Sequence, residues 1–270
     1  RTENIDQAIH HYQQALEVYT KEAYPERWEG IQINIAFAKK LKSGDKLPGN
    51  LDLSILQNEQ EPDENLRQVN PETWAALHMF KATSFAHSKY GDQAGNFEKA
   101  ISHCQRALEV YTRKDYPMDW ASAQNSLGEI YRRRSNLDGP AKNTDQAIFH
   151  YQQALEVATS QTDPDLWAAI HNNLGIACAN GASGDQSENV EQAIQHCQQA
   201  LEVYTRDAYP DDWAMTQNNL GNAYRYRVLG KRAENIEQAI HHFQQALEVQ
   251  SNQAEREQWG ARPNACFVYA

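Results

Sequence analysis

Residues 209–224 read YPDDWAMTQNNLGNAY, and this segment has the pattern of an amphipathic helix. Pro210 suits the first turn of a helix, where a backbone N–H is not needed, and the two aspartates after it favour the positive end of the helix dipole. Trp213, Leu220 and Tyr224 recur on one face at helical spacing. The segment therefore predicts a helix that begins at Pro210 and buries its Trp/Leu/Tyr face.

The same segment recurs along the chain. Its most regular landmarks are the six tryptophans, which follow one another at intervals of 46 or 47 residues: Trp28, Trp74, Trp120, Trp167, Trp213 and Trp259. Prolines precede the earlier tryptophans at Pro25, Pro71, Pro117 and Pro164. A fixed period of this length indicates an array of repeats in which each unit packs on its neighbours.

A second helix follows within each repeat. It contains an Ala-Ile pair, as at Ala193-Ile194 and Ala239-Ile240, and small and large residues alternate after that pair by about one turn. An asparagine stands four residues before each of these alanines, and a glutamine or lysine follows it three residues later. This spacing resembles a capping box, so it predicts the asparagines as N-caps. They are Asn4, Asn96, Asn143, Asn189 and Asn235.

Composition and charge narrow the classes of function. The chain has 270 residues, a net charge of -11 and a hydrophobic content of 40%, which fits a thin array with solvated faces. Excess negative charge repels nucleic acid and acidic lipid, and no apolar run reaches the roughly 20 residues of a membrane span. The four cysteines lack metal-binding spacing, so they read as core residues in a reducing compartment. We expect a soluble, cytoplasmic protein without nucleic-acid or membrane partners.

Together these residues resemble the tetratricopeptide repeat family, whose signature pairs a W…LG..Y helix with an A…F..A helix. Leu127-Gly128 with Tyr131, and Leu220-Gly221 with Tyr224, match it. The usual unit has about 34 residues; the longer unit here is similar to those of kinesin light chain and of bacterial arrays fused to CHAT domains. The resemblance implies an all-α, right-handed superhelical solenoid of antiparallel helix pairs, about 46 residues per repeat, spanning residues 1–270.

One repeat and both ends depart from this pattern. Residues 43–70 are a degenerate repeat segment, with Ser54-Ile55 in place of Ala-Ile and Pro62 in a leucine position. We expect a short helix near residues 51–58 and an irregular stretch over 59–67, either a drifted repeat or a hinge or docking segment, and the order of residues 59–70 is left open. Both ends fall inside a repeat, which favours a fragment of a longer array.

The resemblance also implies a ligand surface. In this family the W…LG..Y helices line the concave groove, so side chains that point away from the Trp/Leu/Tyr face should meet a ligand. An asparagine amide can pair with the N–H and C=O groups of an extended peptide, and an arginine can hold a carboxylate. The alternatives are simple solvation for the amides and favourable helix-end charge for the arginines. The predicted peptide-binding residues are Asn125, Asn172, Asn218, Asn222, Arg132 and Arg225.

The leading hypothesis is a scaffold that binds an extended peptide or partner protein in its concave groove, as the recognition or regulatory module of a larger protein. The alternative is a structural solenoid that forms homo-oligomers through its repeat ends. Histidines recur once per repeat without a carboxylate at ligand spacing, and we interpret them as packing residues rather than a metal site. No catalytic motif is present in the sequence. We therefore predict no enzyme activity, no metal and no cofactor.

Overall fold

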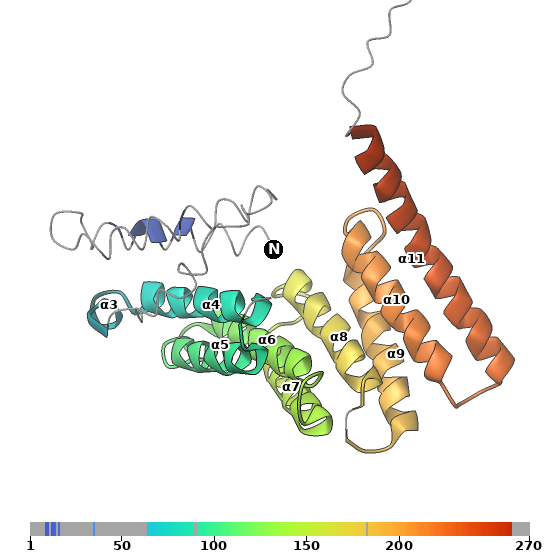
Figure 1. Cartoon of the computed structure of the whole chain (residues 1–270), viewed down its shortest axis with the longest axis horizontal. Coiled ribbons are helices and arrows are strands. Elements are labelled where there is room, and N and C mark those ends of the chain that lie inside the picture. Colours follow the sequence, from blue (N-terminus) through green and yellow to red (C-terminus); the bar gives the residue numbers. More distant parts are fainter. Residues whose placement is uncertain are drawn as a thin grey trace, which may run out of the picture. The chain divides into compact units, whose positions relative to one another are not determined.

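The computed structural model describes residues 64–88, 91–181 and 183–260, together with residues 9, 10, 12–14, 16 and 35. Every regular element in these residues is a helix (Figure 1). The predicted all-α repeat fold is confirmed, whereas the handedness of its superhelix stays a prediction. The chain divides into two compact units, Arg1–Ile130 and Tyr131–Ala270.

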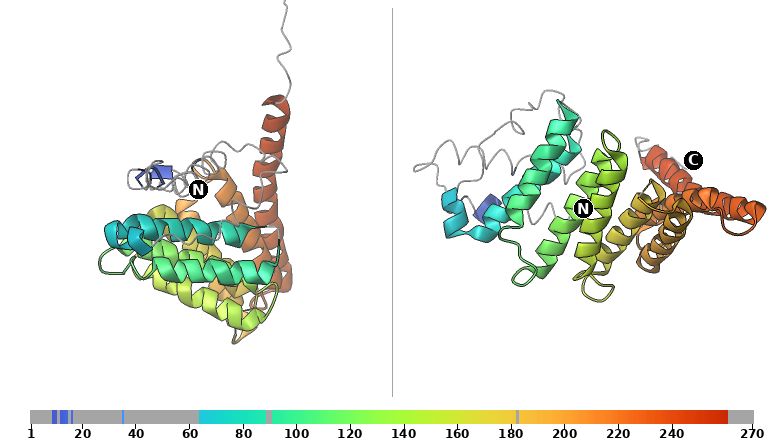
Figure 2. Two further views of the ribbon diagram at one scale, coloured as in Figure 1. Left: turned by 60° about the vertical axis from the view of Figure 1, so that its left-hand side comes forward. Right: turned by 90° about the horizontal axis from the view of Figure 1, so that it is seen from below.

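The first unit is built around one helical hairpin. Helices α4 and α5 lie side by side and form its largest packing interface, and the short helix α3 packs against α4 (Figure 2). The elements of this unit are α3 (Glu64–Val69), α4 (Pro71–His87), α5 (Gln93–Ala107) and the portion of α6 (Pro117–Arg134) that precedes residue 131.

The second unit repeats the hairpin. Helix α8 pairs with α9 and α10 pairs with α11, and α10 also packs on both helices of the preceding hairpin. In Figure 1 these four helices follow one another in chain order. The elements are the end of α6, α7 (Pro140–Leu155), α8 (Pro164–Ala179), α9 (Gln186–Val203), α10 (Pro210–Tyr226) and α11 (Arg232–Gly260).

Proline begins the first helix of each described hairpin, as the sequence predicted: α4, α6, α8 and α10 start at Pro71, Pro117, Pro164 and Pro210. The tryptophan that follows packs inward. Trp74 is fully buried, while Trp120, Trp167 and Trp213 are partly buried against apolar clusters. The indole rings are thus part of the core in every hairpin that the structure describes.

The predicted asparagine N-caps are wrong at the four positions that the structure describes, and Asn4 lies outside the described residues. Helix α5 begins at Gln93 and α9 at Gln186, one turn before Asn96 and Asn189, because Asp92 and Asp185 cap them instead. The asparagines lie inside the first turn, where at least two serve a different purpose. Nδ2 of Asn235 donates hydrogen bonds to the carbonyl of Leu229 at 2.8 Å and to the carbonyl of Arg227. Nδ2 of Asn143 donates to the carbonyl of Asp138. These amides fasten the preceding loop to the helix.

The predicted irregular stretch over residues 59–67 is also wrong in part, because residues 64–69 form α3. Leu66 explains the helix: its side chain is buried in one apolar cluster with Trp74 and Tyr12. Pro62 itself lies outside the described residues. The short helix predicted near residues 51–58 lies outside the described residues.

The two helices of a hairpin approach very closely where the LG pair lies. A Cβ atom built on Gly175 of α8 would stand 2.6 Å from Sγ of Cys197 on α9 and 3.3 Å from the backbone oxygen of Ala193. At Gly221 of α10, the corresponding atom would meet the Phe243 ring of α11 at 2.8 Å. Only glycine leaves room for these contacts, which explains the Leu-Gly pair in the repeat.

We expect the substitution Gly175→Ala to destabilise the protein by about 1–2 kcal/mol. The overlap with Cys197 outweighs the better helix propensity of alanine, since overpacking a filled core costs about 1–3 kcal/mol. Urea unfolding followed by circular dichroism measures the change. The double variant Gly175→Ala/Cys197→Ala removes the overlapping sulfur and should regain stability. If both variants are equally stable, the close contact does not limit packing.

Candidate functional site

Helix α10 carries three of the predicted peptide-binding residues on one stripe. Asn218, Asn222 and Arg225 are spaced as i, i+4 and i+7, so they share a face. Asn222 and Arg225 are exposed and Asn218 is partly exposed. The guanidinium of Arg225 lies over the ring of Tyr226, 5.1 Å from its centroid, which favours a defined position for the charge. This stripe offers amide and cationic groups to solvent.

Asn172 was predicted to belong to the same outward column, and that placement is wrong. Its side chain is 2% exposed. The Oδ1 atom accepts hydrogen bonds from Oγ1 of Thr216 at 3.1 Å and from Nδ2 of Asn219 at 2.9 Å, both on α10. A side chain five residues after the tryptophan of its repeat therefore points toward the first helix of the following repeat. Asn172 links α8 to α10 and faces away from solvent.

Two predicted residues lie on α6, one in each unit. Asn125 is partly buried and already interacts with another group of the chain. Arg132 is also partly buried, and its Nε atom is shielded from solvent without a hydrogen-bond partner among the residues whose positions are described. A buried donor without a partner is costly.

The histidines of the second helices form buried pairs that the sequence analysis did not identify. Nδ1 of His103 lies 2.8 Å from Nδ1 of His78, and Nδ1 of His196 lies 3.0 Å from Nδ1 of His171. In the last hairpin a glutamine replaces the first histidine: Gln217 Oε1 lies 2.6 Å from Nδ1 of His242. The partners are 25 residues apart each time, and this recurring interval was the signal in the sequence.

Burial keeps these rings neutral. It lowers the pKa of His78 to about 3, with further lowering by His103 and nearby cations, and it lowers the pKa of His103 to about 4. Burial, followed by the influence of His196, lowers the pKa of His171 to about 4. Two neutral rings can share one hydrogen bond, but two protonated rings present only donors to each other. The pairs therefore depend on neutral histidine.

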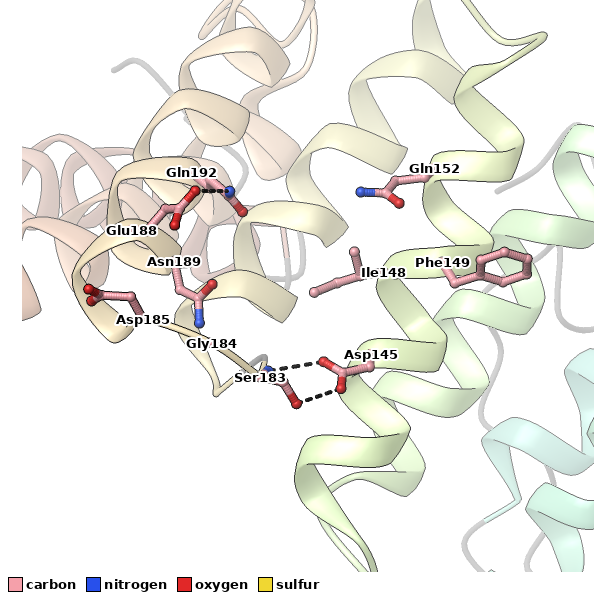
Figure 3. A pocket seen from close by; sticks show the side chains of 10 residues that line it. All are labelled: Asp145, Ile148, Phe149, Gln152, Ser183, Gly184, Asp185, Glu188, Asn189 and Gln192. Atoms are coloured by element: carbon pink, nitrogen blue, oxygen red, sulfur yellow. Dashed lines mark hydrogen bonds between the residues drawn. The ribbon is translucent and has the colours of Figure 1, made fainter.

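A hollow of about 350 Å³ lies between α7, α9 and the loop before α9 (Figure 3). Carboxylates line it, and each of those named next already accepts a hydrogen bond from within the chain. Asp145 accepts hydrogen bonds from the amide and the hydroxyl of Ser183, Asp185 caps α9, and Glu188 accepts one from Gln192 at 3.5 Å. The two bonds from Ser183 to Asp145 fasten the loop to α7.

The three cysteines that the structure describes are buried, which makes their thiols poor nucleophiles. Burial raises the pKa of Cys104 and Cys197 to about 12 and that of Cys178 to about 11, which disfavours the reactive thiolate. Within the described ranges, no group of three or more His, Cys, Asp or Glu side chains is placed to hold a metal ion. None of the helices in the same part of the chain is both long and apolar enough to cross a membrane.

A comparison with protein families finds four matches to the family described as Sel1 repeat, at residues 1–17, 121–156, 170–202 and 214–248. These four segments are similar to Sel1 repeats. These repeats belong to the TPR-like superfamily, so the broader resemblance seen in the sequence is confirmed. The four segments cover less than half of the chain. No curated protein and no solved structure matched it significantly.

The last two Sel1 matches coincide with the hairpins of the second unit. Residues 170–202 cover most of α8 and α9, and residues 214–248 cover most of α10 together with the first part of α11. The Asn172 link and both histidine-containing pairs of this unit lie inside these matches. The narrower resemblance to kinesin light chain and to CHAT-associated arrays stays a prediction.

We expect Asn172→Ala to destabilise the protein by about 1–2 kcal/mol, because it removes the acceptor of the Asn219 amide on α10 and leaves the Thr216 hydroxyl only the carbonyl of Asp212. Asn218 holds the same repeat position on α10 but is partly exposed, so Asn218→Ala is the matched control and should change stability by less than about 0.5 kcal/mol. Urea unfolding of both variants gives the comparison. Equal effects would show that Asn172 does not link the helices.

Acid should destabilise the fold through the histidine pairs. The pKa of buried His171 lies near 4 in the folded protein, against about 6.5 when unfolded. Between these values only the unfolded chain takes up the proton, so stability falls as the pH drops from about 6.5 to about 4. The difference between these two pKa values corresponds to a loss of about 3 kcal/mol for this ring.

The variant His171→Gln tests this origin, since it copies the Gln217–His242 pair already present in the chain. It should lose less stability than the parent between pH 7 and pH 4.5 in urea unfolding experiments. An identical loss in both proteins would assign the acid sensitivity to other groups.

Proposed function

We propose that this protein is an interaction scaffold that binds an extended segment of a partner protein along its first helices. Proteins with Sel1 repeats commonly mediate protein–protein interaction, and the repeat is a non-enzymatic scaffold type. The proposal adds the location and the chemistry of binding. It assigns the contact to the exposed stripe of α10 and to the corresponding part of α6.

The observation that carries the proposal is the exposed row Asn218, Asn222 and Arg225 on α10. An extended peptide has unpaired N–H and C=O groups along its backbone, and an amide side chain can both donate to and accept from them. Arg225 supplies a planar cation that can hold a carboxylate of the ligand with two hydrogen bonds. The row therefore suits a peptide with an acidic side chain or a terminal carboxylate.

Arg132 supports the same type of ligand on α6. Its guanidinium is partly exposed, and a ligand carboxylate would bind its accessible N–H groups rather than the shielded Nε atom. Asn125 lies two turns earlier on the same helix. We include Arg132 in the proposed contact within the second unit and keep Asn125 of the first unit as a separate prediction. Asn172 is left out, because its oxygen is used by α10.

We expect the double variant Asn222→Ala/Arg225→Ala to lose ligand binding by about tenfold or more, because both exposed groups that contact the peptide are removed. The probes are peptides selected from a random 12-residue display library on the full chain, and fluorescence anisotropy measures their affinity. Both residues are exposed, so the fold should be retained.

Phe149→Glu is the control, since Phe149 is also exposed but lies on α7. It should bind the selected peptides like the parent chain. Failure to enrich any peptide, or unchanged affinity in the double variant, would contradict binding at this stripe.

A further inference from the structure

The loop that joins α10 to α11, residues 227–231, and the residue before it expose three large apolar side chains. Tyr226, Val228 and Leu229 are 53%, 74% and 52% exposed. The loops at the same place in the two preceding repeats are exposed too, at residues 136–139 and at residues 181 and 183–185, although a further hairpin follows each of them. Exposure is therefore a property of this loop position within the repeat.

Cationic side chains accompany these apolar groups. Residues 225–232 contain three arginines, one lysine and no acidic residue, in a chain whose net charge is -11. The loops over residues 135–139 and 180–185 contain one aspartate each and no cation. The α10–α11 loop is therefore both apolar and cationic on an otherwise acidic protein. Such a surface favours a ligand that carries carboxylates beside apolar groups.

Hydrogen bonds within the second unit hold the loop in place. Nε and Nη2 of Arg227 bond the two carboxylate oxygens of Glu191 on α9, at 2.7 and 2.9 Å. Nδ2 of Asn235 binds the carbonyl groups of Arg227 and Leu229. A ligand of the exposed side chains thus meets a loop that is already ordered, which lowers the entropy lost on binding.

Lys231 stands where a cation is unfavourable for the fold. It directly precedes α11, and its carbonyl accepts a hydrogen bond from the N–H four residues later, as the carbonyls of Asp92 and Asp185 do. Those two aspartates cap α5 and α9 with their side chains. A lysine cannot accept such bonds, and its charge opposes the positive end of the helix dipole. A residue that breaks a local rule in this way indicates a role other than stability.

The overall charge favours a protein segment over a membrane as the ligand. A lipid surface is broad, so anionic headgroups would face acidic parts of this chain as well as the loop. Like charges repel one another over about 10 Å at moderate ionic strength. A protein segment is narrow enough to contact the loop alone.

We propose that residues 226–232 form a docking surface for an acidic, partly apolar segment of a partner protein. Apolar side chains of the segment pack on the three exposed apolar residues, and its carboxylates pair with Lys231 and Arg232. Lys231 already pairs with Glu234, but both side chains of this pair are largely exposed, at 82% and 63%. Exposed pairs contribute little, so a partner carboxylate can replace Glu234. This surface does not rest on the stripe proposed above.

Peptides selected from a random 12-residue display library on the full chain serve as probes, and fluorescence anisotropy measures their affinity. We expect one class of selected peptides to be rich in aspartate or glutamate beside apolar residues. Its affinity should fall by at least about tenfold in Leu229→Glu and in Lys231→Asp, because both changes place a carboxylate against the carboxylates of the peptide.

Leu137→Glu is the matched control. Leu137 and Leu229 both stand two residues before the residue that precedes a second helix, and they are 47% and 52% exposed. The control should bind these peptides like the parent chain. Asn222→Ala should also leave their affinity unchanged, which separates this surface from the stripe that binds extended peptides.

Lys231→Asp also tests the argument from the helix cap. It supplies the aspartate found at Asp92 and Asp185, so the urea midpoint of unfolding should rise while peptide binding falls. A loss of binding in a more stable variant cannot result from unfolding. A lower midpoint would show that the lysine suits the fold, and would contradict the proposal.

Three further outcomes would overturn it. No selected peptide depends on the loop, or Leu137→Glu and Leu229→Glu weaken binding equally. In the third, the chain binds vesicles of phosphatidylcholine with one third phosphatidylserine and Leu229→Glu abolishes that binding, which would assign the loop to a membrane surface. We expect no binding to these vesicles.

Discussion

The close contact between the two helices of each hairpin determines how the other side chains of the second unit pack. At Gly175 the helices are separated only by the sulfur of Cys197, and the alanines Ala193 and Ala200 on the same side of α9 are fully buried. Such small residues make each hairpin thin. Because there is little room between the two helices of a hairpin, its large side chains lie on its outer faces. There Leu220 and Tyr224 pack on the preceding repeat.

Polar groups are buried at fixed positions within this apolar framework. A histidine pair or a glutamine–histidine pair joins the helices within a hairpin, and Asn172 joins one hairpin to the next. A shift of either helix by one residue would leave these groups unpaired, at a cost of about 1–3 kcal/mol each. Apolar packing supplies most of the stabilisation, and the polar pairs select one register.

The sequence was sufficient for the positions of α4, α6, α8 and α10, because proline and tryptophan mark the start of each of these first helices. The sequence did not show which of two candidate side chains would cap a helix. Asp92 and Asp185 precede the predicted asparagine caps and take the cap, since an aspartate at the helix start also satisfies the dipole. The direction of Asn172 required knowledge of Thr216, a residue 44 positions away that the helical pattern does not relate to it.

Equivalent residues also differ in environment because a repeat is completed by its neighbour. Ile194 and Ile240 have the same repeat position and the same side chain, yet one is buried and the other half exposed. Asn172 and Asn218 differ in the same way. In a linear array each hairpin contributes one half of two interfaces. The same side chain at the same repeat position therefore differs in burial according to what packs on its hairpin, without any change in sequence.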